Sequence, residues 1–203
     1  EKKEPALALA QSAEAALPLR IDNVLYPYLE TFAPPKVTRL QPMDASGPGI
    51  DGLKIQTAKG ADYVIFGESA NARAVFANDK PTTRAQCAVV RTDANGSVRG
   101  FALIWGSEVT FGRALAHSDR PVAGLDVTYR NNVVTVVAKD AGRSLRVAAL
   151  GCKAYSANGG PTVPIRTEGD MFRPFADIDD GAVVVDNESA SFRVEGQTKG
   201  GSV

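Results

Sequence analysis

From Ile21 onward, short strand-forming runs alternate with turn residues, and this pattern constrains the fold more than any other feature of the chain. Runs rich in Val, Ile, Tyr, Phe and Thr are interrupted about every 8–12 residues by Gly, Asn, Asp or Pro. No sustained apolar stripe with the 3.6-residue period of a helix follows Ile21. The sequence therefore predicts an all-β, mostly antiparallel fold, specifically a two-layer β-sandwich. The expected strands are 23–29, 36–41, 52–57, 61–67, 72–76, 85–92, 98–105, 108–112, 122–129, 133–139, 144–150, 152–156, 161–166, 182–186 and 190–195.

One hairpin can be predicted to the residue. Asn tolerates left-handed backbone, so Asn131-Asn132 suits a two-residue turn. That turn sets Tyr129 opposite Val134, Val127 opposite Val136 and Leu125 opposite Ala138, which gives one apolar face for a core.

Asn95-Gly96 predicts a second hairpin, because this dipeptide suits a tight turn between strands. In the strand that follows, Phe101, Leu103 and Trp105 alternate with Ala102 and Ile104, so both faces are apolar. We therefore expect a central strand in which Trp105 is mostly buried.

The chain divides into a short leader and one large domain. Residues 1–20 are rich in Ala and Leu between Pro5 and Pro18, which predicts a helical or flexible leader. Residues 21–203 form the sandwich domain, with a looser acidic part from about residue 158. Because the chain begins with Glu1, we expect any secretory signal to be absent or removed, and the chain to be a fragment.

Charge and hydropathy exclude two classes of partner. The 23 Lys and Arg residues balance the 23 Asp and Glu residues, whereas a nucleic-acid surface needs a basic excess. No apolar run approaches the roughly 20 residues that span a bilayer. The sequence therefore predicts neither nucleic-acid binding nor a membrane span.

The reactive side chains form no recognisable catalytic or metal motif. His117 is the sole histidine, and its neighbours Ser118 and Asp119 cannot complete a triad by adjacency alone, so a surface-loop histidine is favoured. Cys87 and Cys152 allow one disulfide, but free buried thiols are favoured. Asp177–Asp180 resembles a calcium loop without the required spacing, so a solvated acidic turn is favoured. We predict no catalytic residue, metal or cofactor.

Four aromatic residues, Tyr26, Tyr28, Phe32 and Trp105, are the candidates for stacking on a sugar. Tyr26 and Tyr28 project to the same side of a strand, and Pro27 between them favours a sheet edge. We expect this pair to be the carbohydrate-binding site if the chain touches sugar. The alternative is that the pair packs against a neighbouring domain.

Four segments of the chain follow one another in a distinctive order, namely NVLYPY (23–28), ADYVIF (61–66), CAVVRTDANGSVRGFAL (87–103) and GSEVTFG (106–112). Together they resemble the C-terminal β-sandwich region of heparinase II/III-type polysaccharide lyases. In that family a VLYPY strand leads into DYVLF-like and VVRxDxxGxVxxxAL strands, followed by a G-x-x-V-x-x-G segment. The resemblance covers about two thirds of the chain, from Ile21 to Tyr155.

The resemblance implies a non-catalytic module of a carbohydrate-active parent. Such lyases carry a helical toroid that supplies a catalytic Asn, Tyr and His, and no position of this chain matches those residues, so none is carried over. The implied function is an accessory domain that supports the catalytic domain of a polysaccharide-degrading enzyme, in the periplasm or outside the cell. Its implied partners are that catalytic domain and a polysaccharide, which in this family includes acidic polymers. The alternative is a stand-alone carbohydrate-binding or surface adhesion module.

Overall fold

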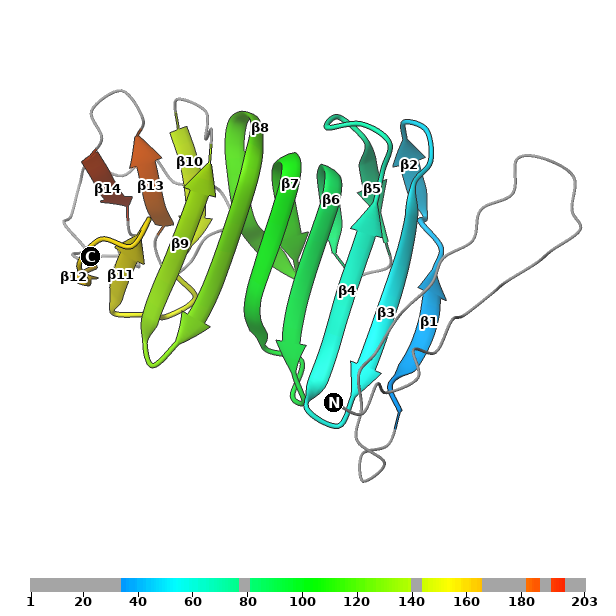
Figure 1. Cartoon of the computed structure of the whole chain (residues 1–203), viewed down its shortest axis with the longest axis horizontal. Helices are drawn as coiled ribbons and strands as arrows, with labels where there is room; N and C mark the ends of the chain where they lie inside the picture. The colour runs from blue at the N-terminus through cyan, green and yellow to red at the C-terminus, as the bar shows by residue number, and fades with distance from the viewer. Residues whose placement is uncertain (1–33, 77–80, 140–143, 166–181, 187–190, 196–203) are drawn as a thin grey trace, which may run out of the picture. The chain divides into compact units, whose positions relative to one another are not determined.

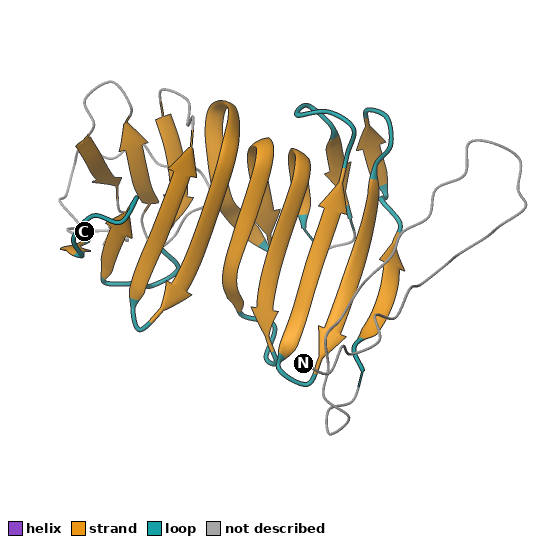
Figure 2. Ribbon diagram, in the orientation of Figure 1, coloured by secondary structure: helices purple, strands orange, loops and turns teal. Residues whose placement is uncertain are grey.

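The computed structural model describes residues 34–76, 81–139, 144–165, 182–186 and 191–195, all within one compact unit, Ala33–Val203. The described residues form strands joined by turns and contain no helix, which confirms the predicted all-β fold (Figure 2). The predicted leader, its boundary at residue 20 and the predicted strand 23–29 lie outside the described residues. The strands are β1 (Lys36–Leu40), β2 (Asp44–Ser46), β3 (Asp51–Thr57), β4 (Gly60–Phe66), β5 (Arg73–Val75), β6 (Thr82–Asp93), β7 (Val98–Phe111), β8 (Arg113–Arg130), β9 (Val133–Lys139), β10 (Ser144–Ala148), β11 (Ala154–Ala157), β12 (Val163–Pro164), β13 (Ala182–Asp186) and β14 (Ser191–Glu195).

All fourteen strands belong to one sheet. Its main path runs β1-β3-β4-β6-β7-β8-β10-β13-β14, with β9 also paired to β8 and β5 also paired to β6. The β9–β11 pair is parallel and the other described pairs are antiparallel. The predicted mostly antiparallel arrangement is therefore confirmed.

The two layers arise because the three longest strands bend. β6, β7 and β8 have 12, 14 and 18 residues, and each curves over along its length (Figure 1). The front layer contains β3, β4, the Asn95 ends of β6 and β7, the Arg130 end of β8, and β9, paired in that order. The other halves of β6, β7 and β8 pair within a rear layer with β5 and β10. The expected sandwich is thus a single sheet folded over on itself.

The bend depends on Gly106. The register between β7 and β8 shifts between Gly106 and Glu108, because β8 inserts extra residues between His117 and Val122. A Cβ atom built on Gly106 would lie 2.5 Å from the Cβ atom of Ala85 on β6. Only glycine allows this close approach of two strands at the fold of the sheet.

The core fills the space between the layers. In the front layer the inward side chains include Phe101, Leu103, Leu125, Val127 and Val136, and each is 3% exposed or less. The rear layer contributes Val109, Leu115, Leu145 and Val147, which are equally buried. Alternate residues along each strand therefore face one continuous apolar interior.

The hairpin at Asn131-Asn132 is confirmed with its predicted register. Tyr129 pairs with Val134, Val127 with Val136 and Leu125 with Ala138. The two asparagines have φ values of 53° and 61°, the left-handed conformation that such a two-residue turn requires. Tyr129 also donates a hydrogen bond of 2.8 Å to the carbonyl oxygen of Ala148, which ties β8 to the end of β10.

The prediction that Trp105 is mostly buried is wrong, since its exposed fraction is 49%. Trp105 has a φ of 46°, so the strand does not alternate regularly at this point. The neighbouring Ile104 is also exposed, at 51%. Two expected strands, 98–105 and 108–112, are in fact the two halves of β7 joined through this irregularity.

Val127→Asp should destabilise the fold by roughly 3–5 kcal/mol, because an unpaired charge would be placed in the core. Val127 is fully buried, whereas the adjacent Thr128 is exposed on the opposite face of β8. Thr128→Asp is therefore the matched control, with a loss of at most about 1 kcal/mol, because Asp is a poorer strand residue than Thr. Urea unfolding measures both, and equal effects would contradict the register.

Asp93 anchors the second predicted hairpin, and its carboxylate makes the stability of the turn depend on pH. Its Oδ1 accepts hydrogen bonds from the backbone N–H groups of Ser97 and Asn95, each 2.9 Å long, and Arg99 lies 2.8 Å from Oδ2. The Ser97 N–H is the main cause that lowers the pKa of Asp93, with further contributions from Asn95 and Arg99. A lowered folded-state pKa stabilises the protein above the unfolded-state pKa, and this stabilisation is lost as pH falls through the folded-state value.

Asp93→Asn should therefore destabilise the protein at pH 7, and the difference from the unaltered chain should shrink in acid. The measurement is the free energy of unfolding of both proteins across the acidic range, with an NMR titration of Asp93 in parallel. A difference that stays constant with pH would show that the charge on Asp93 does not contribute.

Candidate functional site

Several residues singled out from the sequence lie outside the described residues. Tyr26 and Tyr28, the predicted carbohydrate-binding pair, are among them, as are Phe32 and the acidic run Asp177–Asp180. Their roles remain predictions from the sequence.

His117 lies in strand β8, not in the surface loop that the sequence predicts. It is exposed on the outer face of the rear layer, paired in register with Glu108 on one side and Arg146 on the other. The next residue, Ser118, is 3% exposed, and its Oγ has no hydrogen-bond partner. Because consecutive strand residues project to opposite faces, His117 and Ser118 do not form a catalytic pair.

Both cysteines are free thiols, as the sequence analysis favoured, but both are half-buried instead of buried. Cys87 lies in β6, and Cys152 precedes β11 instead of lying in a strand as predicted. Burial raises the pKa of each thiol, so neither is activated as a nucleophile. Within the described residues, no three His, Cys, Asp or Glu side chains gather closely enough to hold a metal ion.

The most unusual surface of the described residues is the outer face of the front layer. In an antiparallel sandwich the outward side chains are ordinarily polar. Here the middle parts of two adjacent rows that cross the strands are apolar, and we name these parts together the apolar face. The first is Phe66, Cys87 and Ile104, and the second is Leu53, Val64, Val89 and Ala102, as the strand registers place them. The same rows continue into charged residues at their ends, Asp51 and Lys139 in the first row and Arg39 and Asp126 in the second.

The apolar face is partly solvent-accessible. Apart from the exposed Ile104, its members are half-buried. In the next outward row Asp62, Arg91 and Thr128 are polar and exposed, whereas Val37 and Ile55 at the β1–β3 end of that row are apolar. Polar residues are what a solvated sheet presents, so the apolar face stands out on β4, β6 and β7 as a surface suited to covering.

A shallow hollow lies at one side of the apolar face. Gly124 forms part of its floor, and a Cβ atom there would meet only the Cβ of Lys139, at 3.9 Å. The hollow has a volume of about 330 Å³, and Ile104 and Val137 line it with more than half of each side chain exposed. Asp126 on its rim lies 3.9 Å from Arg91, so an ion pair borders the apolar floor.

Trp105 extends the exposed apolar surface at the bend of the sheet. Its left-handed backbone costs energy in a residue other than glycine, and such strain clusters at functional positions. In a regular strand, Ile104 and Trp105 would face opposite sides, yet both are about half exposed. The exposure of both side chains could not be predicted from the sequence, because assigning alternate residues to opposite faces assumes a regular strand.

The described surfaces are suited to contact with another molecule. An apolar sheet face, a shallow hollow and an exposed indole offer surfaces for a protein domain or for the flat face of a sugar. Comparison of the chain with protein-family models and with curated proteins finds no match. Among the described residues, no helix is long and apolar enough to cross a membrane.

Because the chain contains a single tryptophan, its fluorescence reports on Trp105 alone. We expect red-shifted native emission and strong acrylamide quenching, since the indole is half exposed. Unfolding in urea should raise the quenching constant only slightly, because the indole is already half exposed in the folded chain. Blue-shifted emission with weak quenching in the native state would instead place the indole in the core.

Proposed function

We propose that this chain is an accessory, non-catalytic β-sandwich domain of a polysaccharide-degrading enzyme of the heparinase II/III-like lyase type. In this proposal the apolar face packs against the catalytic domain and supports it. The observation that carries the proposal is the apolar face, centred on Val64, Val89 and Ala102, on a sheet surface that would ordinarily be polar.

The physical argument rests on the cost of leaving such a surface in water. Burying apolar area stabilises a contact by about 25 cal/mol per Å². Ile104 and Val137 each expose more than half of their side chains beside the half-buried Val89 and Ala102. A rigid sheet with this surface needs no rearrangement to receive another domain, so little ordering entropy opposes the contact.

The lyase assignment and the location rest on the sequence resemblance. The resembling segments Ala61–Phe66 and Cys87–Leu103 are strands β4, β6 and β7, which also carry the apolar face. An enzyme of this type acts on polymers in the periplasm or outside the cell, and we extend that location to this chain. The polysaccharide would then reach this domain through the catalytic domain that it supports.

Ile104→Glu tests the domain contact in the complete polypeptide that contains this domain. A buried, unpaired carboxylate at the contact should lower the thermal stability of the complete polypeptide and its rate of uronate elimination. The same substitution in the isolated chain should leave urea unfolding nearly unchanged, because Ile104 faces outward.

Thr128→Glu is the control, since Thr128 is exposed on the same layer but outside the apolar face. If both substitutions affect the complete polypeptide equally, the apolar face is not a domain contact. Uronate elimination catalysed by the isolated chain would contradict the accessory role itself.

A stand-alone carbohydrate-binding or adhesion module is the second candidate, and the exposure of Trp105 favours it. Sugar rings stack on flat aromatic surfaces, and an exposed indole offers the largest such surface. Affinity gel electrophoresis against a panel of acidic and neutral polysaccharides distinguishes the two functions. If a polysaccharide retards the chain in the gel and Trp105→Ala removes this retardation, the binding module is supported with Trp105 as its contact. If only the Tyr26→Ala, Tyr28→Ala double variant removes the retardation, the tyrosine pair is the binding site.

A further inference from the structure

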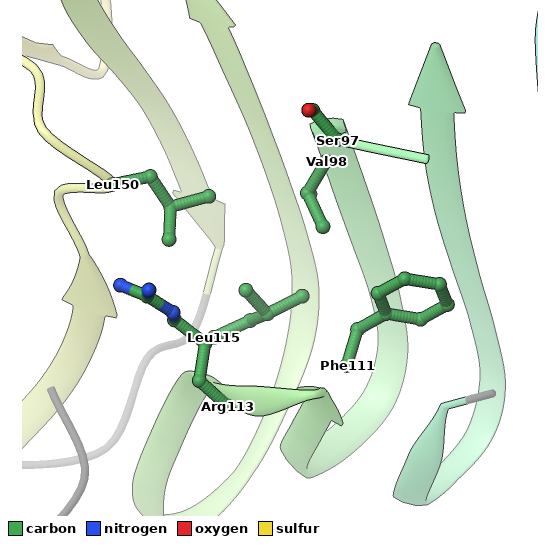
Figure 3. A pocket seen from close by; sticks show the side chains of 6 residues that line it. All are labelled: Ser97, Val98, Phe111, Arg113, Leu115 and Leu150. Atoms are coloured by element: carbon green, nitrogen blue, oxygen red, sulfur yellow. The ribbon is translucent and has the colours of Figure 1, made fainter. Parts of the chain in front are cut away.

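A pocket opens between the two layers at the end of β7, away from the apolar face. Its lining consists of Ser97, Val98, Phe111, Arg113, Leu115 and Leu150 (Figure 3). Leu150 and Gly151 have left-handed φ values of 47° and 76°, and Leu150 lies beside the guanidinium of Arg113 (Figure 3). The accessible lining of this pocket is more polar than apolar, and Arg113 already interacts with another group, so the pocket defines no ligand.

The hollow beside the apolar face is different, because it exists where Gly124 has no side chain. Gly124 lies inside β8 and pairs with Ile104 of β7 on one side and Lys139 of β9 on the other. Both partners point to the outer face of the front layer, and the next residue, Leu125, is buried in the core. A side chain at position 124 would therefore point outward and occupy the hollow.

None of the described residues requires a glycine at position 124. Its φ is not positive, so other residues could adopt this backbone, and a Cβ atom would meet only the Cβ of Lys139, at 3.9 Å. At the other glycines inside strands a Cβ atom would lie 3.1 Å or less from a neighbour, namely at Gly52, Gly60, Gly100 and Gly106. Glycine weakens a strand and often marks a place where a ligand or another chain approaches closely. The space over Gly124 thus points to a group that arrives from outside.

The lining of the hollow is apolar with one acceptor at its rim. Gly124 and Ala102 form the floor, and Ile104 and Val137 expose more than half of their side chains beside it. The carboxylate of Asp126 lies 3.9 Å from Arg91, which is longer than a hydrogen bond, and both side chains are about half exposed. The Asp126 oxygens can therefore accept a hydrogen bond from a group in the hollow.

We propose that one tyrosine or tryptophan side chain of the catalytic domain inserts into this hollow and anchors the domain contact. The ring would lie on the floor between Ile104 and Val137, and its O–H or N–H would donate a hydrogen bond to Asp126. The volume of about 330 Å³ corresponds to roughly eleven water-sized groups at about 30 Å³ each, which is room for one aromatic side chain. This inference rests on the proposed accessory function and adds the kind of partner residue that the apolar face receives.

The lining distinguishes such an anchor from a sugar and from an aliphatic side chain. A sugar would bring several hydroxyl groups that each need a partner, whereas Asp126 and Lys139 are the only polar side chains in the lining. An aliphatic side chain would cover Asp126 without offering it a donor, which costs desolvation energy. Tyrosine and tryptophan combine an apolar ring with a polar edge, and they are the residues enriched at the centres of protein contacts.

The first test titrates this chain with N-acetyltyrosinamide, which offers a tyrosine side chain with uncharged ends. The NMR signals of the Ile104 and Val137 methyl groups should shift saturably. Those of Val37, an exposed valine of β1 on the same outer face, should not shift. N-acetylphenylalaninamide, which lacks the O–H group, should bind at least about threefold more weakly, because Asp126 then receives no hydrogen bond.

Gly124→Leu fills the hollow and should abolish these shifts. The isolated variant should keep its urea midpoint, because a Cβ atom at position 124 meets no close neighbour. Thr128→Leu is the matched control, since it adds the same side chain to the same face of β8 outside the hollow. This control should bind N-acetyltyrosinamide as the unaltered chain does.

The same two variants test the anchor in the complete polypeptide. Gly124→Leu should lower the unfolding temperature and the rate of uronate elimination, as Ile104→Glu does, whereas Thr128→Leu should leave both unchanged. If Ile104→Glu has this effect and Gly124→Leu has none, the anchor is overturned and the domain contact stands. If neither substitution has an effect, the proposed domain contact fails as well.

Other results would also overturn the anchor. One is the absence of saturable shifts at Ile104 and Val137. Tighter binding of methyl glucuronide than of N-acetyltyrosinamide would assign the hollow to a sugar instead. A dimer of this chain that Gly124→Leu dissociates, measured by sedimentation, would assign the hollow to a second copy.

Discussion

The close approach of β6 and β7 at the bend, where Gly106 lies against Ala85, is the constraint on which the rest of the structure depends. A sheet can bend sharply where a glycine lets two neighbouring strands approach more closely than a side chain would allow. At this point a Cβ on Gly106 would lie 2.5 Å from the Ala85 Cβ, too close for any other residue without displacement. The bend brings the two halves of one sheet face to face, and their inward side chains then make the core.

Both surfaces of interest follow from this folding of one sheet. The front layer turns one face to the core and leaves the rows around Val64, Val89 and Ala102 on the outside. The same bend returns Phe111 to the neighbourhood of Val98, which creates the pocket between the layers. The strained backbone at Trp105 belongs to the bend as well, and it leaves the only indole of the chain half exposed.

The hairpin around Asn131-Asn132 and the exposure of Trp105 show where prediction from sequence succeeds and fails. The hairpin register follows from local rules, since two asparagines define the turn and period-two alternation defines the faces. The burial of Trp105 depends on whether β7 is regular, and its left-handed φ lies beside shifts in the register of β7 with β6 and with β8, two strands that pair with it in the folded sheet. The Leu150–Gly151 turn escaped prediction for a similar reason, because nothing in a leucine indicates a left-handed conformation.

The sequence by itself determined the all-β class, the positions of most described strands and the register of the Asn131-Asn132 hairpin. These depend on turn chemistry and on the alternation of apolar side chains, which are local properties of the chain. Only the tertiary structure decided that one continuous sheet folds over, that apolar residues gather on its outward face, and that Arg113 meets Leu150 at a pocket. Those features depend on which strands become neighbours, and that choice is made by the packing of the whole core rather than by any short segment.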